Sequence, residues 1–188
     1  MKSKVIMCPI CGEHHFTSEN DHEICRICGW ENEGFGTDGF FPTGANHVSF
    51  HAYKMRYRLL KRIDHTYRWI SKPDLWNQID SDFEWLPAPV TTSHVHSELS
   101  MDSVAHVAWF YRWRGDQIVR ATYEGILEVN ISIPRGEREK AESIYDSLKN
   151  EIRVMHAAKD YPDMLNKFAD EIKERYQPFL VEWDGTFD

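Results

Sequence analysis

Cysteine is scarce in this chain of 188 residues, and none of it lies beyond residue 30. The sequence also lacks any apolar run near the roughly 18 residues of a membrane span, and its first residues lack the apolar stretch of a signal peptide. Basic residues are outnumbered, with 22 Lys and Arg against 30 Asp and Glu and a formal net charge of −8. We therefore expect a soluble, cytoplasmic protein with no membrane contact and no general affinity for nucleic-acid phosphates.

Catalytic motifs are missing as well. The chain has no P-loop, no G-x-S-x-G nucleophile motif, no H-E-x-x-H zinc-protease motif and no Rossmann glycine string. The composition is otherwise that of an ordinary globular protein, with 41% hydrophobic and 28% charged residues. These absences predict a folded protein that is not an enzyme.

The four cysteines form two closely spaced pairs. They are Cys8, Cys11, Cys25 and Cys28, in the pattern C-x2-C-x13-C-x2-C. Two thiolates that are two residues apart can turn around one metal ion, and two such pairs complete the tetrahedral sulfur shell that Zn²⁺ accepts. A glycine follows each pair, which permits the positive φ that turns backbone N–H groups toward the sulfurs. The pattern predicts one structural zinc ion, because a closed shell leaves no position for a substrate.

Other interpretations of the cysteines stay open at this stage. Two disulfides would need an oxidising compartment, and a redox-active C-x-x-C would need a thioredoxin-like βαβ context that the sequence lacks. A four-sulfur shell also holds iron. His14, His15 and His22 lie in the loop between the pairs. Since four thiolates already fill the shell, we expect these histidines to face solvent.

Three segments carry a family resemblance. They are C-P-I-C-G at 8–12, E-I-C-R-I-C-G-W-E at 23–31 and T-G-A-N-H-V-S-F at 43–50. The stretch from Cys8 to about Tyr57 resembles the CPCC family of small cysteine-rich bacterial domains, which implies a zinc-binding module and little about activity. It departs from the Cys-Pro-Cys-Cys run of the family name at Ile10. Both cysteine pairs survive that change.

A helix is expected to follow this module, over residues 49–70, with Asn46 or Ser49 as its cap. Trp30 is placed to shield the sulfurs from water. The residues of the inward stripe of the helix are Tyr53, Tyr57, Leu60 and His65. The basic residues of the helix are Lys54, Arg56, Arg58, Lys61, Arg62 and Arg68. This basic cluster allows a nucleic-acid-binding zinc-ribbon regulator as an alternative function, although a solvated helix face that balances an acidic body is the favoured interpretation.

The remaining segments predict an antiparallel sheet and helices. Periodicity predicts a short helix near 73–80, strands at 104–113, 118–124, 126–133 and 179–183, and helices at 137–158 and 163–176. Runs of strands followed by helices indicate an α+β fold. We expect a small zinc-ribbon-like module over residues 1–60 and an α+β domain, with its antiparallel sheet packed against helices, over residues 72–188.

One group of residues keeps a metal-dependent enzyme among the alternatives. His94 and His96 would point to the same face of a strand, as paired metal ligands do. Asp102 and His106 could complete such a site, and Glu98 lies between. A polar loop that happens to contain histidine is the favoured interpretation, because H-x-H is short and common.

Charge and aromatic residues favour a protein partner. Residues 61–188 carry 16 basic and 23 acidic residues and six of the seven Trp. An acidic surface favours a basic target, and exposed Trp is a strong hot-spot residue at interfaces. We expect a non-enzymatic, zinc-binding bacterial protein that acts through protein–protein interaction. An immunity or antitoxin role against a basic toxin or nuclease is the most concrete form of that hypothesis.

Overall fold

A computed structural model describes five ranges of the chain. They are residues 6–33, 44–82, 107–112, 117–133 and 137–176. The chain divides into two compact units, one of Met1–Asp82 with Asp146–Ala157 and the other of Phe83–Tyr145 with Ala158–Asp188. The domain bounds expected from the sequence, 1–60 and 72–188, stay a prediction.

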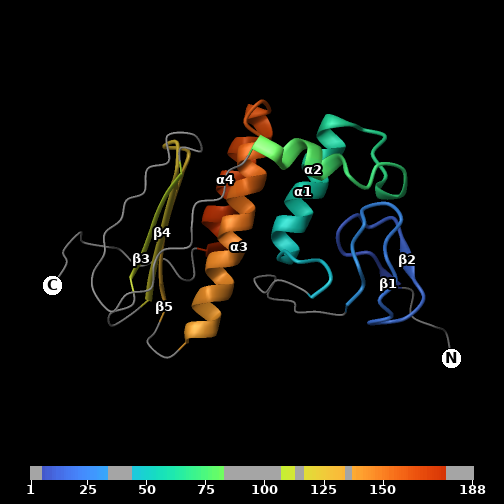
Figure 1. Ribbon diagram of the computed structural model, residues 1–188, viewed down its shortest axis with the longest axis horizontal. Helices are drawn as coiled ribbons and strands as arrows, with labels where there is room; N and C mark the ends of the chain where they lie inside the picture. Colours follow the sequence, from blue (N-terminus) through green and yellow to red (C-terminus); the bar gives the residue numbers. More distant parts are fainter. Residues whose placement is uncertain (1–5, 34–43, 83–106, 113–116, 134–136, 177–188) are drawn as a thin grey trace. The chain divides into compact units, whose positions relative to one another are not determined.

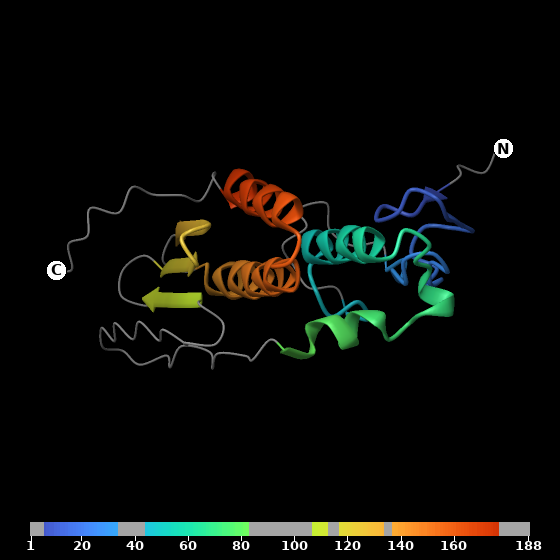
Figure 2. The same ribbon diagram turned by 90° about the horizontal axis from the view of Figure 1, so that it is seen from above.

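The first unit begins with a very short hairpin. Strands β1 (Ile6–Met7) and β2 (His15–Phe16) pair antiparallel, with Ile6 opposite Phe16. Helix α1 (Phe50–Ile63) follows, and then a 3-10 turn at Trp69–Ser71, helix α2 (Leu75–Ile79) and a second 3-10 turn at Asp80–Asp82. Figures 1 and 2 show the hairpin and the two helices. The expected short helix near 73–80 is confirmed as α2.

Ser49, one of the two residues expected to cap this helix, is the N-cap of α1. Its backbone is extended and its Oγ accepts a hydrogen bond from the Ala52 N–H at 3.3 Å. The Ser49 and Ser147 hydroxyls are hydrogen-bonded at 2.8 Å, and Ser147 donates to the Glu151 carboxylate at 3.2 Å. All three of these polar residues are buried. Residues from the C-terminal half of the chain therefore hold the start of α1.

The expected helix over 49–70 is too long, because α1 ends at Ile63. Asp64 has an extended backbone, and its carboxylate accepts hydrogen bonds from Thr66 N–H at 2.9 Å and Thr66 Oγ at 2.6 Å. A further hydrogen bond from Lys72 holds the pKa of Asp64 below its usual range. This local bonding replaces the next helical turn. The expected inward stripe is confirmed at Tyr53, Tyr57 and Leu60 and is wrong at His65, which is exposed.

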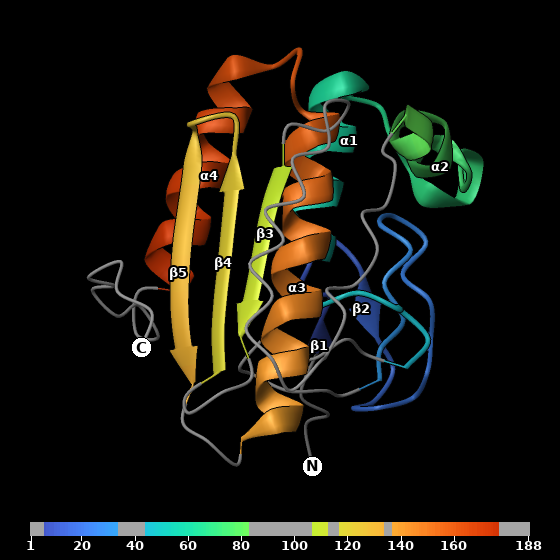
Figure 3. The ribbon, with the colours of Figure 1, turned by 60° about the vertical axis from the view of Figure 1, so that its left-hand side comes forward.

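The second unit contains an antiparallel sheet of three strands in the order β3–β4–β5. They are β3 (Val107–Arg112), β4 (Gln117–Tyr123) and β5 (Leu127–Ile133). The register places Ala121 opposite Val129 and Tyr123 opposite Leu127. These four side chains are buried together with Ile131 and Ile133, so β5 alternates inward and outward as its sequence predicts. Figure 3 shows the sheet face-on.

Two long helices follow the sheet. They are α3 (Arg138–Ala157), which has residues in both units, and α4 (Pro162–Tyr176), which contacts β5. The expected inward residues Ile144, Leu148, Phe168 and Ile172 are buried. The α+β fold is thus confirmed. No helix in the described ranges has the length and apolar character that crossing a membrane requires. The strand expected at 179–183 falls outside those ranges.

We predict that Ser49→Ala lowers the free energy of unfolding of the first unit by about 2 kcal/mol, because it removes both the helix cap and the hydrogen-bond partner of Ser147. Urea unfolding followed by the helical circular dichroism signal measures this loss. Ser18→Ala is the matched control, since Ser18 is exposed and its replacement is expected to change stability by less than about 0.5 kcal/mol. Equal effects of the two substitutions would contradict the prediction.

Candidate metal centre

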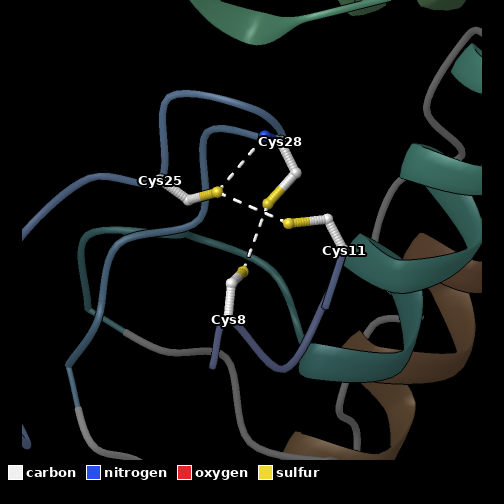
Figure 4. A group of neighbouring side chains, drawn as sticks. All are labelled: Cys8, Cys11, Cys25 and Cys28. Carbon is white, nitrogen blue, oxygen red and sulfur yellow. Dashed lines mark hydrogen bonds between the residues drawn. The ribbon is translucent and has the colours of Figure 1, made fainter. Parts of the chain in front are cut away.

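The fold brings the four cysteine sulfurs together. All four Sγ atoms lie within 4.8 Å of one another, although the two pairs are far apart in the sequence. The Sγ of Cys8 lies 3.5 Å from that of Cys28, and the Sγ of Cys11 lies 3.6 Å from that of Cys25. Figure 4 shows the four side chains pointing toward a common centre. Each close distance therefore joins one cysteine of the first pair to one of the second.

Each cysteine pair sits in a tight backbone turn. In the first, the Gly12 N–H donates to the Cys8 carbonyl at 2.9 Å, and in the second the Gly29 N–H donates to the Cys25 carbonyl at 2.7 Å. The N–H of Cys28 also donates to the Cys25 sulfur at 3.5 Å. Both turns thus curl around their sulfurs in the way that two-residue spacing predicts.

The glycine that closes each turn has a left-handed backbone. The φ angle is +69° at Gly12 and +83° at Gly29. Side chains with a Cβ rarely adopt this conformation, so the expected role of both glycines is confirmed.

Aromatic side chains bury the sulfur cluster. Cys8, Cys25 and Cys28 are at most 3% exposed, and Trp30 is 4% exposed in the same apolar cluster. Cys11 is half-buried. The Trp30 ring meets the Tyr53 ring edge-on, with 5.1 Å between centroids. The expectation that Trp30 shields the cluster is consistent with this burial.

Tyr53 joins α1 to the second turn. Its hydroxyl donates to the Cys28 carbonyl at 2.9 Å. Burial raises the pKa of Tyr53, which keeps the hydroxyl protonated and able to donate. The helix and the cysteine cluster are therefore held together by a hydrogen bond as well as by apolar contact.

The thiols compete for a single negative charge. Hydrogen bonds from Cys28 and Cys8 lower the pKa of Cys25, since they stabilise its thiolate. The hydrogen bond with Cys25 raises the pKa of Cys8 to about 12 and raises that of Cys28 as well. Among these three thiols, the thiolate form is therefore favoured at Cys25. A cation at the centre would stabilise further thiolates.

The sulfur positions fit a tetrahedral metal ion. A Zn–S bond of about 2.3 Å corresponds to sulfur–sulfur distances of about 3.8 Å at the edges of a tetrahedron. Two of the distances, 3.5 and 3.6 Å, are close to that value, and none exceeds 4.8 Å. The cluster can therefore hold a metal that accepts four thiolates, such as zinc or iron.

The histidines between the cysteine pairs make other contacts. His14 Nε2 lies 3.0 Å from a Glu23 carboxylate oxygen, and His22 Nδ1 lies 3.0 Å from a Glu31 carboxylate oxygen. His15 is exposed. Within the ranges that the structure describes, the four cysteines are the residues grouped closely enough to hold a metal ion.

Glu33 is a structural residue that the sequence patterns did not single out. It is 7% exposed, and its Oε1 accepts hydrogen bonds from Ala45 N–H at 2.7 Å and Asn46 N–H at 3.0 Å. The Asn46 side chain both accepts from and donates to the backbone of Glu31, at 2.9 and 3.0 Å. Asn46 therefore joins two loop segments instead of capping α1. The sequence signal that pointed to this loop was the G-A-N motif at residues 44–46.

Trp69 is a second residue that the sequence patterns missed. A Cβ placed on Gly29 would lie 2.4 Å from Cδ1 of Trp69, so the indole covers the glycine directly. The N–H groups of Trp69 and Ile70 donate to the carbonyls of Ile27 and Arg26, at 2.9 and 3.2 Å. The segment after α1 is therefore built onto the second cysteine turn.

The second candidate metal site suggested by the sequence lies outside the described residues. Its residues are His94, His96, Glu98, Asp102 and His106.

Comparison with known proteins supports the resemblance seen in the sequence. Residues 6–63 match the family described as cysteine-rich CPCC, which is about a third of the chain. The match includes both cysteine pairs, the G-A-N segment and α1. Ile10, where the chain departs from the family name, is 6% exposed and packs in the apolar cluster around the sulfurs. No curated protein and no solved structure matches the chain.

We predict that Gly29→Ala destabilises the first unit more than Gly12→Ala. Both substitutions impose the strain of a positive φ, about 1–2 kcal/mol. Only Gly29→Ala also displaces Trp69, since a Cβ on Gly12 would meet nothing within 4 Å. Loss of the indole contact adds about 1–2 kcal/mol. Urea unfolding of the two variants, followed by tryptophan fluorescence, measures the difference, and equal destabilisation would show that the Trp69 contact contributes nothing.

Proposed function

We propose that Cys8, Cys11, Cys25 and Cys28 bind one structural zinc ion. The convergence of four sulfurs within 4.8 Å is the observation that carries this proposal. Zinc would supply positive charge to the thiolates and cross-link two turns that are 13 residues apart in the sequence. Since the protein fills all four positions, none is left for a substrate or a reactive water. The role of the metal is therefore to stabilise the fold.

We predict one zinc ion per purified chain and a loss of at least most of it in Cys25→Ser, because three thiolates no longer complete the shell. Elemental analysis for zinc and iron, together with thiol titration after chelation, measures both. His22→Ala is the matched control and is expected to keep its zinc, since His22 is exposed and bonded to Glu31. Iron in place of zinc, or disulfides in place of free thiols, would contradict the assignment.

We propose that the protein acts by binding another protein rather than by catalysis, with its fold stabilised by the metal. Two features support this function. The metal shell is closed, and the sequence holds none of the common catalytic motifs. The chain is also strongly acidic, with a net charge of −8. Such a charge speeds encounter with a basic protein and disfavours acidic ones.

Apolar side chains on the surface of the first unit support an interaction role. Ile70 is 58% exposed and Ile24 is 41% exposed. The N–H of Ile70 bonds to Arg26, so Ile70 lies beside the second cysteine turn, and Ile24 directly precedes that turn in the sequence. Exposed isoleucine is costly in water unless a partner covers it. We infer that this surface is part of the binding site for the partner protein.

The most specific form of the proposal is an immunity or antitoxin protein. Small acidic proteins of this kind neutralise basic toxins or nucleases by covering their active surfaces. The support here is the acidic charge, together with a metal-stabilised module that has exposed apolar groups.

We predict that the full chain, used as bait in extracts of its source cell, retains a basic protein and that Ile70→Asp reduces the amount retained at least tenfold. An aspartate at that position would replace an apolar contact with a charged group that binding must strip of water. Asn77→Asp is the matched control, since it adds the same charge at another exposed position. Purification of the chain without any partner, or equal loss in both variants, would contradict the proposal.

A nucleic-acid-binding regulator is the alternative function. Two of the basic residues of α1 make local contacts, in which Lys61 donates to the His65 carbonyl and Lys54 lies over the Phe50 ring. A phosphate-binding surface needs several cations free to face the same strand. We therefore expect only weak nucleic-acid binding.

A further inference from the structure

A small cleft in the first unit lies away from the cysteine cluster. Its walls come from α1, α2 and the Asp146–Ala157 part of α3, and its volume is about 30 Å³. The polar side chains that line it are Arg56, Asn150 and Arg153, and the aromatic one is Trp76. This volume is below the roughly 300–1,000 Å³ of pockets that take drug-sized ligands. The cleft therefore suits a small ligand or a single chemical group.

Arg56 is held in the cleft by two aromatic rings. Its guanidinium carbon lies 4.1 Å from the centroid of the Tyr53 ring and 5.4 Å from that of the Trp76 ring. Stacking uses the flat faces of the guanidinium, whereas its N–H groups point outward in its plane. The two rings thus fix the orientation of the group.

No ion pair joins Arg56 to any residue within the described ranges. An arginine that is half-buried and oriented in advance loses little entropy when an acceptor arrives. Two oxygens of one anion match its parallel N–H donors. Arg56 therefore has the features of a binding residue rather than those of a solvated surface charge.

Two arginines, Arg56 and Arg153, line the cleft in a chain whose overall charge is −8. Arg153 is paired with Asp80, so its charge is compensated. The charge of Arg56 has no such ion-pair partner within the described ranges.

We propose that this cleft binds a small oxyanion, a carboxylate or phosphate group, with Arg56 as its main ligand and with the amide of Asn150 and Arg153 at the rim. Carboxylate and phosphate groups both present a pair of anionic oxygens that can lie in one plane with the guanidinium. The site does not depend on zinc chemistry or on a protein partner. It adds a ligand-binding function to the proposed interaction role, and each can fail without the other.

Nuclear magnetic resonance titration of the full zinc-loaded chain tests the proposal. Inorganic phosphate and acetate are the probes, and sodium chloride replaces them at constant ionic strength in the reference titration. The Nε–H signal of Arg56, identified by its loss in Arg56→Gln, is expected to shift and saturate with phosphate or acetate but not with chloride. The indole N–H signal of Trp76, identified through Trp76→Phe, is expected to move with it.

Two variants decide whether Arg56 is the ligand. Arg56→Gln is expected to weaken binding at least tenfold, equivalent to about 1.4 kcal/mol, with the indole signals as the readout. Arg62→Gln is the matched control, because Arg62 is exposed on the same helix and the charge change is identical. If Arg56→Gln unfolds, Arg56→Lys replaces it, since it keeps the charge and removes the planar pair of donors. Unchanged affinity in the folded Arg56 variant, or equal shifts with chloride, would overturn the proposal.

Discussion

The convergence of four cysteine sulfurs, three of them buried, is the constraint on which the first unit depends. The hairpin supplies only two residues in each strand, which is too little hydrogen bonding for independent stability. Its apolar cluster is instead built around Cys8, Cys25 and Cys28, with Trp30 and Tyr53 against them. A metal bound by the sulfurs would neutralise their charge and hold this cluster together as the core of the unit.

Several segments outside the family match complete this core. The match ends at residue 63, yet Trp69 covers Gly29 and Ser147 bonds to the cap of α1. Ser147 is buried and Trp69 is half-buried, and both contact parts of the matched region. The cysteine module in this chain therefore extends beyond the residues that match the family. It includes residues that are more than 80 positions away from them in the sequence.

The proposed metal shell would separate stability from function in this molecule. Four protein ligands would leave the metal no open position, so binding would use surfaces that the metal only supports. The first unit offers two such surfaces of different chemistry. One is apolar and includes Ile70 beside the second cysteine turn, and the other is the cleft at Arg56. Tyr53 connects the cleft to the cluster, since its hydroxyl bonds to Cys28 and its ring stacks on Arg56.

The sequence alone determined the features that depend on local spacing. Two-residue cysteine spacing with a following glycine predicted both turns, and periodicity predicted α3, α4 and the alternation of β5, because neighbouring residues impose these patterns. It did not determine the end of α1, where the Asp64 carboxylate bonds to Thr66 and stops a helix that periodicity extends to residue 70. The roles of Glu33, Trp69 and Ser147, and the stacking of Arg56 on Trp76, were decided by tertiary structure. Each of these contacts joins residues that are distant in the chain, and no local pattern specifies which distant group a buried side chain will meet.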